Sequence, residues 1–181
     1  HHPDQHRGAV ADDAQVEMIH YHGTPITPKA QLESMAGRHF CVSYPRPDNL
    51  KTCLRIGQSL MLDNGAFSVF TRGAIFDRDG FYAWIEPILA HPHWAVVPDE
   101  IGGTVEQQRS MVATWPHRKE YGAPVWHLGL PLEYLFDLCN DWPKVCIGSS
   151  GKWAVQHGVG AWTWRSTRWC SNLGGCLGCM D

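Results

Sequence analysis

Short apolar runs alternate with helical patterns along most of the chain, and this alternation constrains the fold more than any other feature. We expect strands at 18–22, 39–44, 59–63, 94–99, 123–128 and 144–149. Helical patterns lie between them, at 27–37, after Asp48, and at 81–91, 104–115 and 131–141. Such alternation predicts a parallel sheet, and strands that are apolar nearly throughout fit a sheet covered on both faces. Periodicity alone leaves open a doubly wound sheet or six of the eight units of a (β/α)8 barrel.

Details of the sequence refine some of these elements. Thr27 is expected to cap the first helix, with Pro28 at its first position and Gly37 at its end. Asp48 is expected to cap the short helix that follows it, and Pro87 to kink the helix at 81–91.

Composition places the chain among ordinary globular proteins. Of its 181 residues 44% are hydrophobic and 18% charged, and the net charge is -3, so bulk charge does not indicate a polyanionic partner. No apolar stretch is long enough to span a membrane, and the N-terminus lacks the apolar core of a secretory signal, so we expect a cytoplasmic location. We expect a disordered extension over 1–17, one domain over 18–167, and an irregular tail rich in Cys and Gly over 168–181.

Polar side chains gather at the predicted carboxyl ends of the strands, where parallel α/β folds place their sites. In chain order these are His22, Tyr44, Asp63, Asp99, His127 and the run from Gly148. Gly65 allows a tight turn that leaves the Asp63 carboxylate at the rim, and Phe67 follows two residues later. Asp99 and Glu100 come directly after Pro98. Two carboxylates and two imidazoles on one rim predict a polar active site.

The cysteines give a weak metal signal. Cys41 and Cys146 lie in apolar runs and are expected to be buried thiols. Cys170, Cys176 and Cys179 include a Cys-x2-Cys pair, but no His follows to complete a zinc site. We therefore expect no metal and no cofactor, with zinc as the alternative.

Four motifs resemble, in this order, segments of the tRNA-guanine (queuine) transglycosylase superfamily. They are LDNGAFS at 62–68, VVPDEIGG at 96–103, PVWHLG at 124–129 and CIGSSG at 146–151. The first is closest in style to the DpdA-like DNA-modifying enzymes of phages and bacteria. The resemblance implies an incomplete TIM-like barrel that exchanges guanine for a 7-deazaguanine such as preQ0 or preQ1, in DNA or tRNA, through an Asp-based glycosyl-enzyme.

The resemblance also assigns roles to single residues. Asp63 matches the general base that also positions the substrate. Phe67 matches a ring stacked on the base, Asp99 the acid that reads the edge of the base, and Gly148 the backbone loop near its exocyclic groups. The full set of expected substrate-binding residues is Phe67, Ser68, Asp99, Glu100, His127, Gly148 and Ser149, and His127 stands near the position of a family Gln.

The nucleophile of the family is missing from its expected place. The family carries an attacking Asp on a later strand, whereas this chain has no acidic residue between Asp141 and Asp181. We therefore expect the chain to be truncated before its nucleophile. Two alternatives stay open. One is an unrelated barrel hydrolase or lyase that uses Asp63 and Asp99 as an acid/base pair, and the other is a non-catalytic module that binds a purine or nucleotide.

Overall fold

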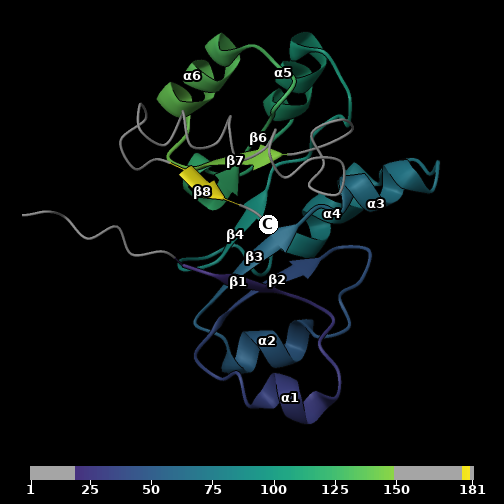
Figure 1. The fold of residues 1–181 in the computed structure, drawn as a ribbon, viewed down its shortest axis with the longest axis vertical. Coiled ribbons are helices and arrows are strands. Elements are labelled where there is room, and N and C mark those ends of the chain that lie inside the picture. Colours follow the sequence, from purple (N-terminus) through teal and green to yellow (C-terminus); the bar gives the residue numbers. More distant parts are fainter. Residues whose placement is uncertain (1–18, 149–176, 180–181) are drawn as a thin grey trace, which may run out of the picture.

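The structure is a computed structural model, and it describes residues 19–148 and 177–179 (Figure 1). Parallel strands alternate with helices along the chain. The strands are β1 Tyr21–Gly23, β2 His39–Ser43, β3 Ser59–Asp63, β4 Trp94–Val96, β5 Gly122–Ala123, β6 Val125–His127, β7 Val145–Gly148 and β8 Leu177–Cys179. The helices are α1 Lys29–Glu33, α2 Leu50–Ile56, α3 Ala66–Thr71, α4 Arg78–Ile85, α5 Val105–Ala113 and α6 Leu132–Asp141, with a 3-10 turn at Lys119–Tyr121.

The strands are neighbours in space in the same order as in the sequence. One sheet has the order β1-β2-β3-β4-β5 and a second has the order β6-β7-β8, and every pairing is parallel. Pro124 separates β5 from β6, yet its carbonyl oxygen accepts a hydrogen bond from Cys146 N at 2.8 Å, while Ala123 O accepts from Val97 N at 2.9 Å. The backbone pairing thus passes from one sheet into the next. The predicted α/β fold with a parallel sheet is confirmed.

The two faces of the sheet pack against different parts of the protein. On β3, Leu60 and Leu62 belong to a core cluster shared with α1, α2 and α4, and on β6 Trp126 belongs to a cluster shared with α6. The alternate residues, such as Met61, form a separate cluster that includes no helix residue. We call the sheet face that carries this third cluster the inner face. Its members are Met61, Val96, Ala123, Val125 and Cys146, with Tyr21, Cys41 and Trp94 packed against them.

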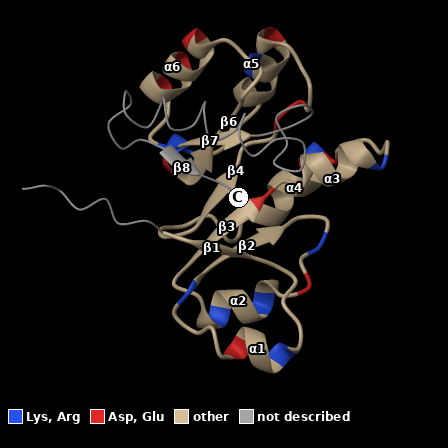
Figure 2. Cartoon of the chain, viewed as in Figure 1, with Lys and Arg blue, Asp and Glu red and all other residues tan. Residues whose placement is uncertain are grey.

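Strands from β1 to β7 all contribute to this inner-face cluster, so the sheet must curve around it. The helices follow on the outside, with α1 and α2 beside β1 to β3 and with α5 and α6 beside β6 and β7 (Figure 1). Figure 2 shows Lys, Arg, Asp and Glu intermixed over the helices and loops, in keeping with the small net charge. Within the described ranges, no helix has the length and apolarity needed to cross a membrane.

Several helix ends differ from their predicted positions. Thr27 was expected to cap α1, but Pro28 occupies the cap position and the helix starts at Lys29. Asp48 was expected to cap α2, but Asn49 occupies the cap position without a side-chain hydrogen bond to the helix, while Asp48 pairs with Arg46 at 3.2 Å. In both cases the helix begins one residue later than predicted.

The helix predicted at 81–91 begins earlier and ends earlier. Asp77 caps α4 by accepting a hydrogen bond from Gly80 N at 3.0 Å, and the helix ends at Ile85. Pro87 therefore follows the helix instead of kinking it, because a proline ring clashes with the carbonyl of the preceding turn. The capping box of α5 is confirmed: Thr104 Oγ1 accepts from Gln107 N at 3.3 Å, and Gln107 Oε1 accepts from Thr104 N at 2.8 Å.

One α-helix and one strand were not predicted. Helix α3 starts directly after the turn that follows Asp63, where the sequence indicated only a turn. Strand β8 pairs with β7, although it lies in the segment 168–181 that was expected to be irregular. Glycines interrupt the apolar residues of this segment, so its pattern does not indicate a strand without its neighbour.

Candidate functional site

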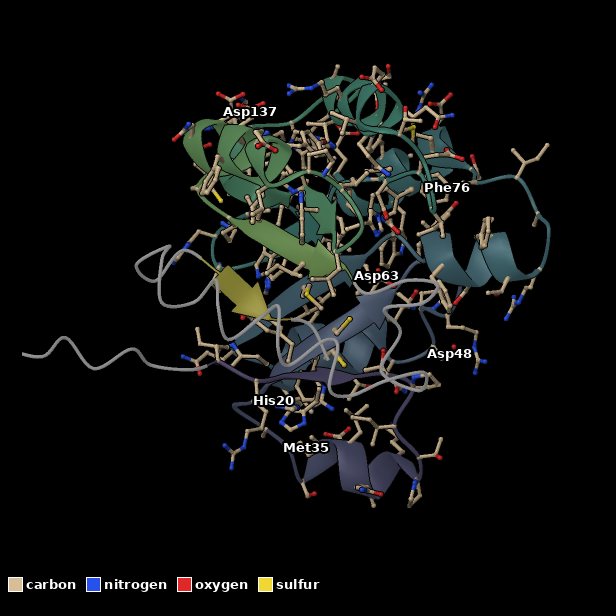
Figure 3. The ribbon with its side chains drawn as sticks, turned by 45° about the horizontal axis from the view of Figure 1, so that its top comes forward. His20, Met35, Asp48, Asp63, Phe76 and Asp137 are labelled. Carbon is tan, nitrogen blue, oxygen red and sulfur yellow. The ribbon has the colours of Figure 1, made fainter. Side chains whose placement is uncertain are left out.

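Four strands end in residues that point to the inner face. Ser43 and Asp63 are in register at the ends of β2 and β3, and His127 and Gly148 are in register at the ends of β6 and β7. Strict alternation along each strand places them on the same face as Met61 and Cys146. Figure 3 shows Asp63 at the end of its strand. The inner face therefore carries a polar edge at its carboxyl end, as the sequence predicted.

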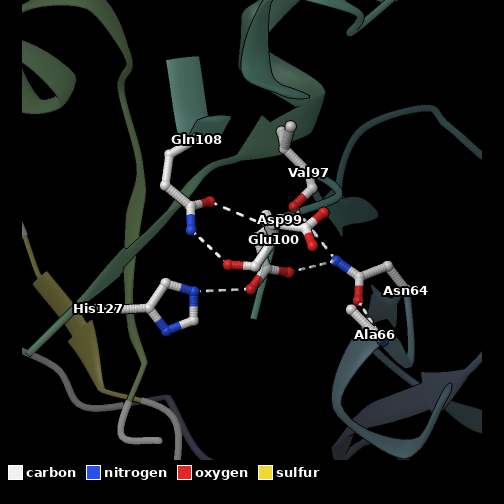
Figure 4. Close-up of polar contacts among 7 residues, drawn as sticks. All are labelled: Asn64, Ala66, Val97, Asp99, Glu100, Gln108 and His127. Atoms are coloured by element: carbon white, nitrogen blue, oxygen red, sulfur yellow. Dashed lines mark hydrogen bonds and ion pairs between the residues drawn. The ribbon is translucent and has the colours of Figure 1, made fainter. Parts of the chain in front are cut away.

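Asp99 is held from both sides at this edge (Figure 4). Its Oδ1 accepts a hydrogen bond from Asn64 Nδ2 at 3.1 Å, and its Oδ2 lies 2.8 Å from His127 Nε2. The Asp99 and His127 side chains are 8% and 10% exposed, so this pair is shielded from solvent. Asn64 is itself fixed, since its Nδ2 also donates to Val97 O at 3.2 Å and its Oδ1 accepts from Ala66 N at 2.7 Å.

Asp63 has a different environment from Asp99. Its Oδ2 accepts a hydrogen bond from Ser43 Oγ at 2.8 Å, and the Gly65 backbone N–H also donates to it. Burial raises the pKa of the Asp63 carboxyl group above its ordinary value; the two hydrogen bonds oppose this shift and the nearby charge of Asp99 adds to it. A carboxyl group with a raised pKa exchanges protons closer to neutral pH than an ordinary one does.

Gly65 makes this arrangement sterically feasible. Its φ is +71°, in the left-handed region that favours glycine. A Cβ atom at this position would lie 2.4 Å from Cδ of Pro45, so no larger residue fits. The chain can therefore turn sharply after Asn64 and begin α3 at once, as the sequence predicted for the turn.

Two thiols lie close to the carboxyl groups. Burial raises the pKa of Cys41 to about 12, and the charge of Asp63 adds to the shift. Burial likewise raises the pKa of Cys146 to about 12, with further contributions from Asp99 and Asp63. Both thiols therefore stay protonated at neutral pH and form a neutral part of the inner face below the polar edge.

A buried glutamine fixes the loop that leaves Asp99. Gln108 on α5 is 1% exposed; its Oε1 accepts from Glu100 N at 3.1 Å, and its Nε2 donates to Glu100 O at 2.5 Å. These contacts satisfy both backbone polar groups of Glu100 and connect the loop to a helix. The Glu100 side chain itself is exposed.

The structure brings together only some of the predicted site residues. Asp63, Asp99, His127 and Gly148 share the carboxyl end of the inner face. Ser68 is half-buried on α3, and Ser149 lies outside the described residues.

Phe67, Tyr44 and His22 have other surroundings. Phe67 lies on α3 with 53% of its surface exposed. Tyr44 points to the outer face, where its hydroxyl donates to Asp77 Oδ2 at 3.1 Å, because it is one residue out of phase with Ser43. His22 packs its ring against His20 at 4.5 Å.

Sequence reasoning missed three residues that shape the site: Ser43, Asn64 and Gln108. Ser43 was detectable, because it is the last inner-face residue of the strand predicted at 39–44. Asn64 follows Asp63 directly but gave no signal of its own, since its partners Val97 and Asp99 are more than 30 residues away in the chain. Gln108 lies one position beyond the capping box, which drew attention to Gln107 instead.

The described residues contain no group of three or more His, Cys, Asp or Glu side chains that could hold a metal ion. The side chains of Cys170, Cys176 and Cys179 lie outside the described part of the chain. What the described site offers is a proton-exchanging carboxyl group, a second carboxylate held in place, and an imidazole. Comparison with family models, with curated proteins and with solved structures found no match to this chain.

Proposed function

We propose that this protein exchanges a guanine base in nucleic acid for a 7-deazaguanine. The observation that carries the proposal is the placement of Asp63 and Asp99 on one edge of the inner face in different environments. Base exchange needs one group that passes a proton to and from the base, and another that holds the base. The pKa of the buried Asp63 carboxyl group is raised, while Asn64 and His127 hold the Asp99 carboxylate in place, so the two acids are suited to different roles.

Asp63 takes the first role, because its raised pKa favours proton transfer to the departing guanine and from the incoming base. The edge formed by Asp99 and His127 contacts the polar edge of the base. Phe67, exposed on α3, supplies a ring on which a base can stack. We place the acid that attacks the sugar carbon outside the described residues, as the resemblance of the motifs implies.

The strand order supports a barrel as the scaffold for this reaction. A doubly wound sheet reverses its strand order at a switch point and carries helices on both faces. The described strands follow one another without reversal, and the inner-face cluster includes no helix residue. We therefore propose that the sheet belongs to a (β/α)8-type barrel with its site at the carboxyl ends of the strands.

An incorporation assay tests the proposal. The full-length protein is incubated with labelled preQ0 or preQ1 and with either DNA or tRNA, and label in the nucleic acid is counted. We expect Asp63→Asn to reduce incorporation about 100-fold or more, the usual contribution of a general acid or base. Asp79→Asn is the matched control, since the Asp79 side chain on α4 is 90% exposed. Undiminished incorporation by Asp63→Asn, or none by the wild type, would refute the proposal.

One contact favours a second candidate, a hydrolase or lyase that acts by acid/base chemistry on a small substrate. The 2.8 Å contact between Asp99 and His127 is the type of pair that orients a general base. This enzyme would bind no purine, whereas a non-catalytic purine-binding module would bind guanine without exchanging it. Measuring guanine binding beside incorporation separates the three.

A further inference from the structure

One nitrogen at the site lacks a hydrogen-bond partner. His127 Nδ1 is buried and has no partner among the described residues, whereas Nε2 of the same ring contacts Asp99. The whole residue is 8% exposed. Leaving a buried polar atom without a partner is unfavourable, and native proteins rarely do so without a functional reason. The pairing of the other nitrogen determines what Nδ1 can bind.

The contacts of Asp99 indicate the tautomer of His127. Asn64 Nδ2 donates to Oδ1 of Asp99, so the carboxylate acts as an acceptor on that side. A carboxylate that accepts at Oδ2 as well requires a proton on Nε2 of the imidazole. In the neutral ring Nδ1 then carries a lone pair and accepts hydrogen bonds. Asn64 and Asp99 together thus present Nδ1 as a fixed acceptor.

Gly148 lies beside this acceptor on the inner face. A Cβ atom at position 148 would lie 2.9 Å from His127 Nδ1 and 2.9 Å from Val125 Cγ1. Val125 belongs to the inner-face cluster, so the space next to Nδ1 lies on that face. Glycine at position 148 therefore lets the backbone of β7 approach the ring closely on that face. A ligand at the polar edge whose N–H group reaches Nδ1 would give this buried atom the partner that it lacks among the described residues.

We propose that His127 is a specificity-determining residue whose Nδ1 accepts a hydrogen bond from a ring or amino N–H of the purine base. Asp99 and Asn64 act as positioning residues that set the tautomer and hold the ring. The inference rests on the proposed function and names the contact that selects the base. It adds the imidazole to the base-reading role that the resemblance assigns to Asp99, because Nδ1 is a buried acceptor without a partner among the described residues.

Selectivity follows from the burial of the acceptor. A base with an N–H at this position satisfies Nδ1, whereas a base without one leaves it unpaired. A site that hydrogen-bonds a polar group of its ligand strongly rejects analogues that lack this group. An apolar pocket rejects a ligand that lacks one methylene group much more weakly. The site is therefore expected to discriminate guanine, with donors at N1 and at the exocyclic amino group, from bases that lack one of them.

The tautomer is measured first, by nitrogen NMR of the histidine rings in the wild-type protein, with His127 assigned by its loss in His127→Gln. We expect Nδ1 of His127 to be unprotonated and Nε2 to be protonated at neutral pH. We also expect Asp99→Asn to disturb this state. A protonated Nδ1 in the wild type overturns the inference, whichever ligand the protein binds.

Binding of guanine, hypoxanthine and 1-methylguanine is then compared by calorimetry. Hypoxanthine lacks the exocyclic amino group and 1-methylguanine lacks the N1 hydrogen, and we expect one of them to bind roughly tenfold more weakly, or worse, than guanine. His127→Gln keeps an acceptor and should keep this ratio, whereas His127→Leu should reduce it towards one. His20→Leu is the control and should behave as the wild type, because His20 is exposed and directly precedes β1, at the opposite end of the strand from the polar edge.

The outcomes separate the inference from the proposed function. If wild type binds guanine but discriminates against neither analogue, or if His127→Leu keeps the wild-type ratio, the inference fails while base exchange stands. If wild type binds no guanine at all, the proposed function fails, and the tautomer alone then decides whether His127 presents an acceptor.

Discussion

Replacing Asn64 by aspartate should destabilise the protein strongly at alkaline pH and much less at acidic pH. The two side chains have the same shape, so no cavity forms. The introduced carboxylate would still accept from Ala66 N, but it could no longer donate to Val97 O or Asp99 Oδ1, the bonds of 3.2 and 3.1 Å. The substitution also sets two carboxylates side by side within a buried site.

The size of the effect follows from these contacts. A buried acceptor that loses its donor costs about 1–3 kcal/mol. Two unit charges at the Asn64–Asp99 separation of 3.1 Å repel by about 5 kcal/mol at an effective dielectric constant of about 20. The pair limits this repulsion by binding a proton. We expect a loss of about 3–5 kcal/mol at pH 8, a large part of the ~5–15 kcal/mol of a typical domain.

The pH dependence has a definite sign. Like charge and burial raise the folded-state pKa of the new pair above its unfolded value, so the folded variant binds more protons than the unfolded chain. The loss relative to wild type is therefore full above the raised pKa and shrinks as the pH falls through it, because a protonated carboxyl group can donate to its neighbour.

Urea unfolding followed by tryptophan fluorescence, at pH 8 and at pH 5, measures this difference. The control is Asn49→Asp, because Asn49 Oδ1 accepts from Ile26 N at 2.7 Å and an aspartate keeps that bond. We expect the control to change stability by less than about 0.5 kcal/mol. An equal loss at both pH values, or no loss at either, would contradict the role assigned to Asn64.

Three further predictions concern single residues. Burial raises the folded-state pKa of Asp63, so the contribution of this carboxyl group to stability is present at low pH and is lost as the pH rises through that pKa. Asp63→Asn should therefore gain stability relative to the wild type as the pH is raised from 4 to 8 in urea titrations. A stability difference that does not change with pH would argue against the raised pKa. Gly148→Ala should cost about 1–3 kcal/mol by crowding His127, whereas Gly23→Ala, with no atom within 4 Å of its Cβ, should be nearly neutral in the same titrations. Thr104→Ala should cost about 1 kcal/mol by removing the cap of α5, and unchanged stability would show that the capping box contributes nothing.

Much of the scaffold was predictable from local patterns. Strand β3 has the predicted bounds, and helices α5 and α6 lie within or close to theirs, because amphipathic periodicity and caps act over a few residues. Predictions of helix ends were less successful: Asp77 caps α4 through Gly80 N, although the apolar pattern that predicted this helix begins only at Phe81. Strand β8 depends on its pairing with β7 and could not be foreseen from its own residues.

The candidate site, too, has one part that was predictable from the sequence and one part that depends on tertiary contacts. Strand periodicity alone places Asp63 and His127 at carboxyl ends, since in a parallel sheet all such ends lie on one edge. It cannot say which side chains meet there, because hydrogen bonds depend on distances between residues far apart in the chain. Tertiary packing brings Asn64 to Asp99 and Asp99 to His127, and leaves Nδ1 of that ring beside Gly148 without a partner among the described residues. Local periodicity thus accounts for the edge of the sheet, while the packing of distant strands decides which buried atom on that edge is left unpaired within the described part of the chain.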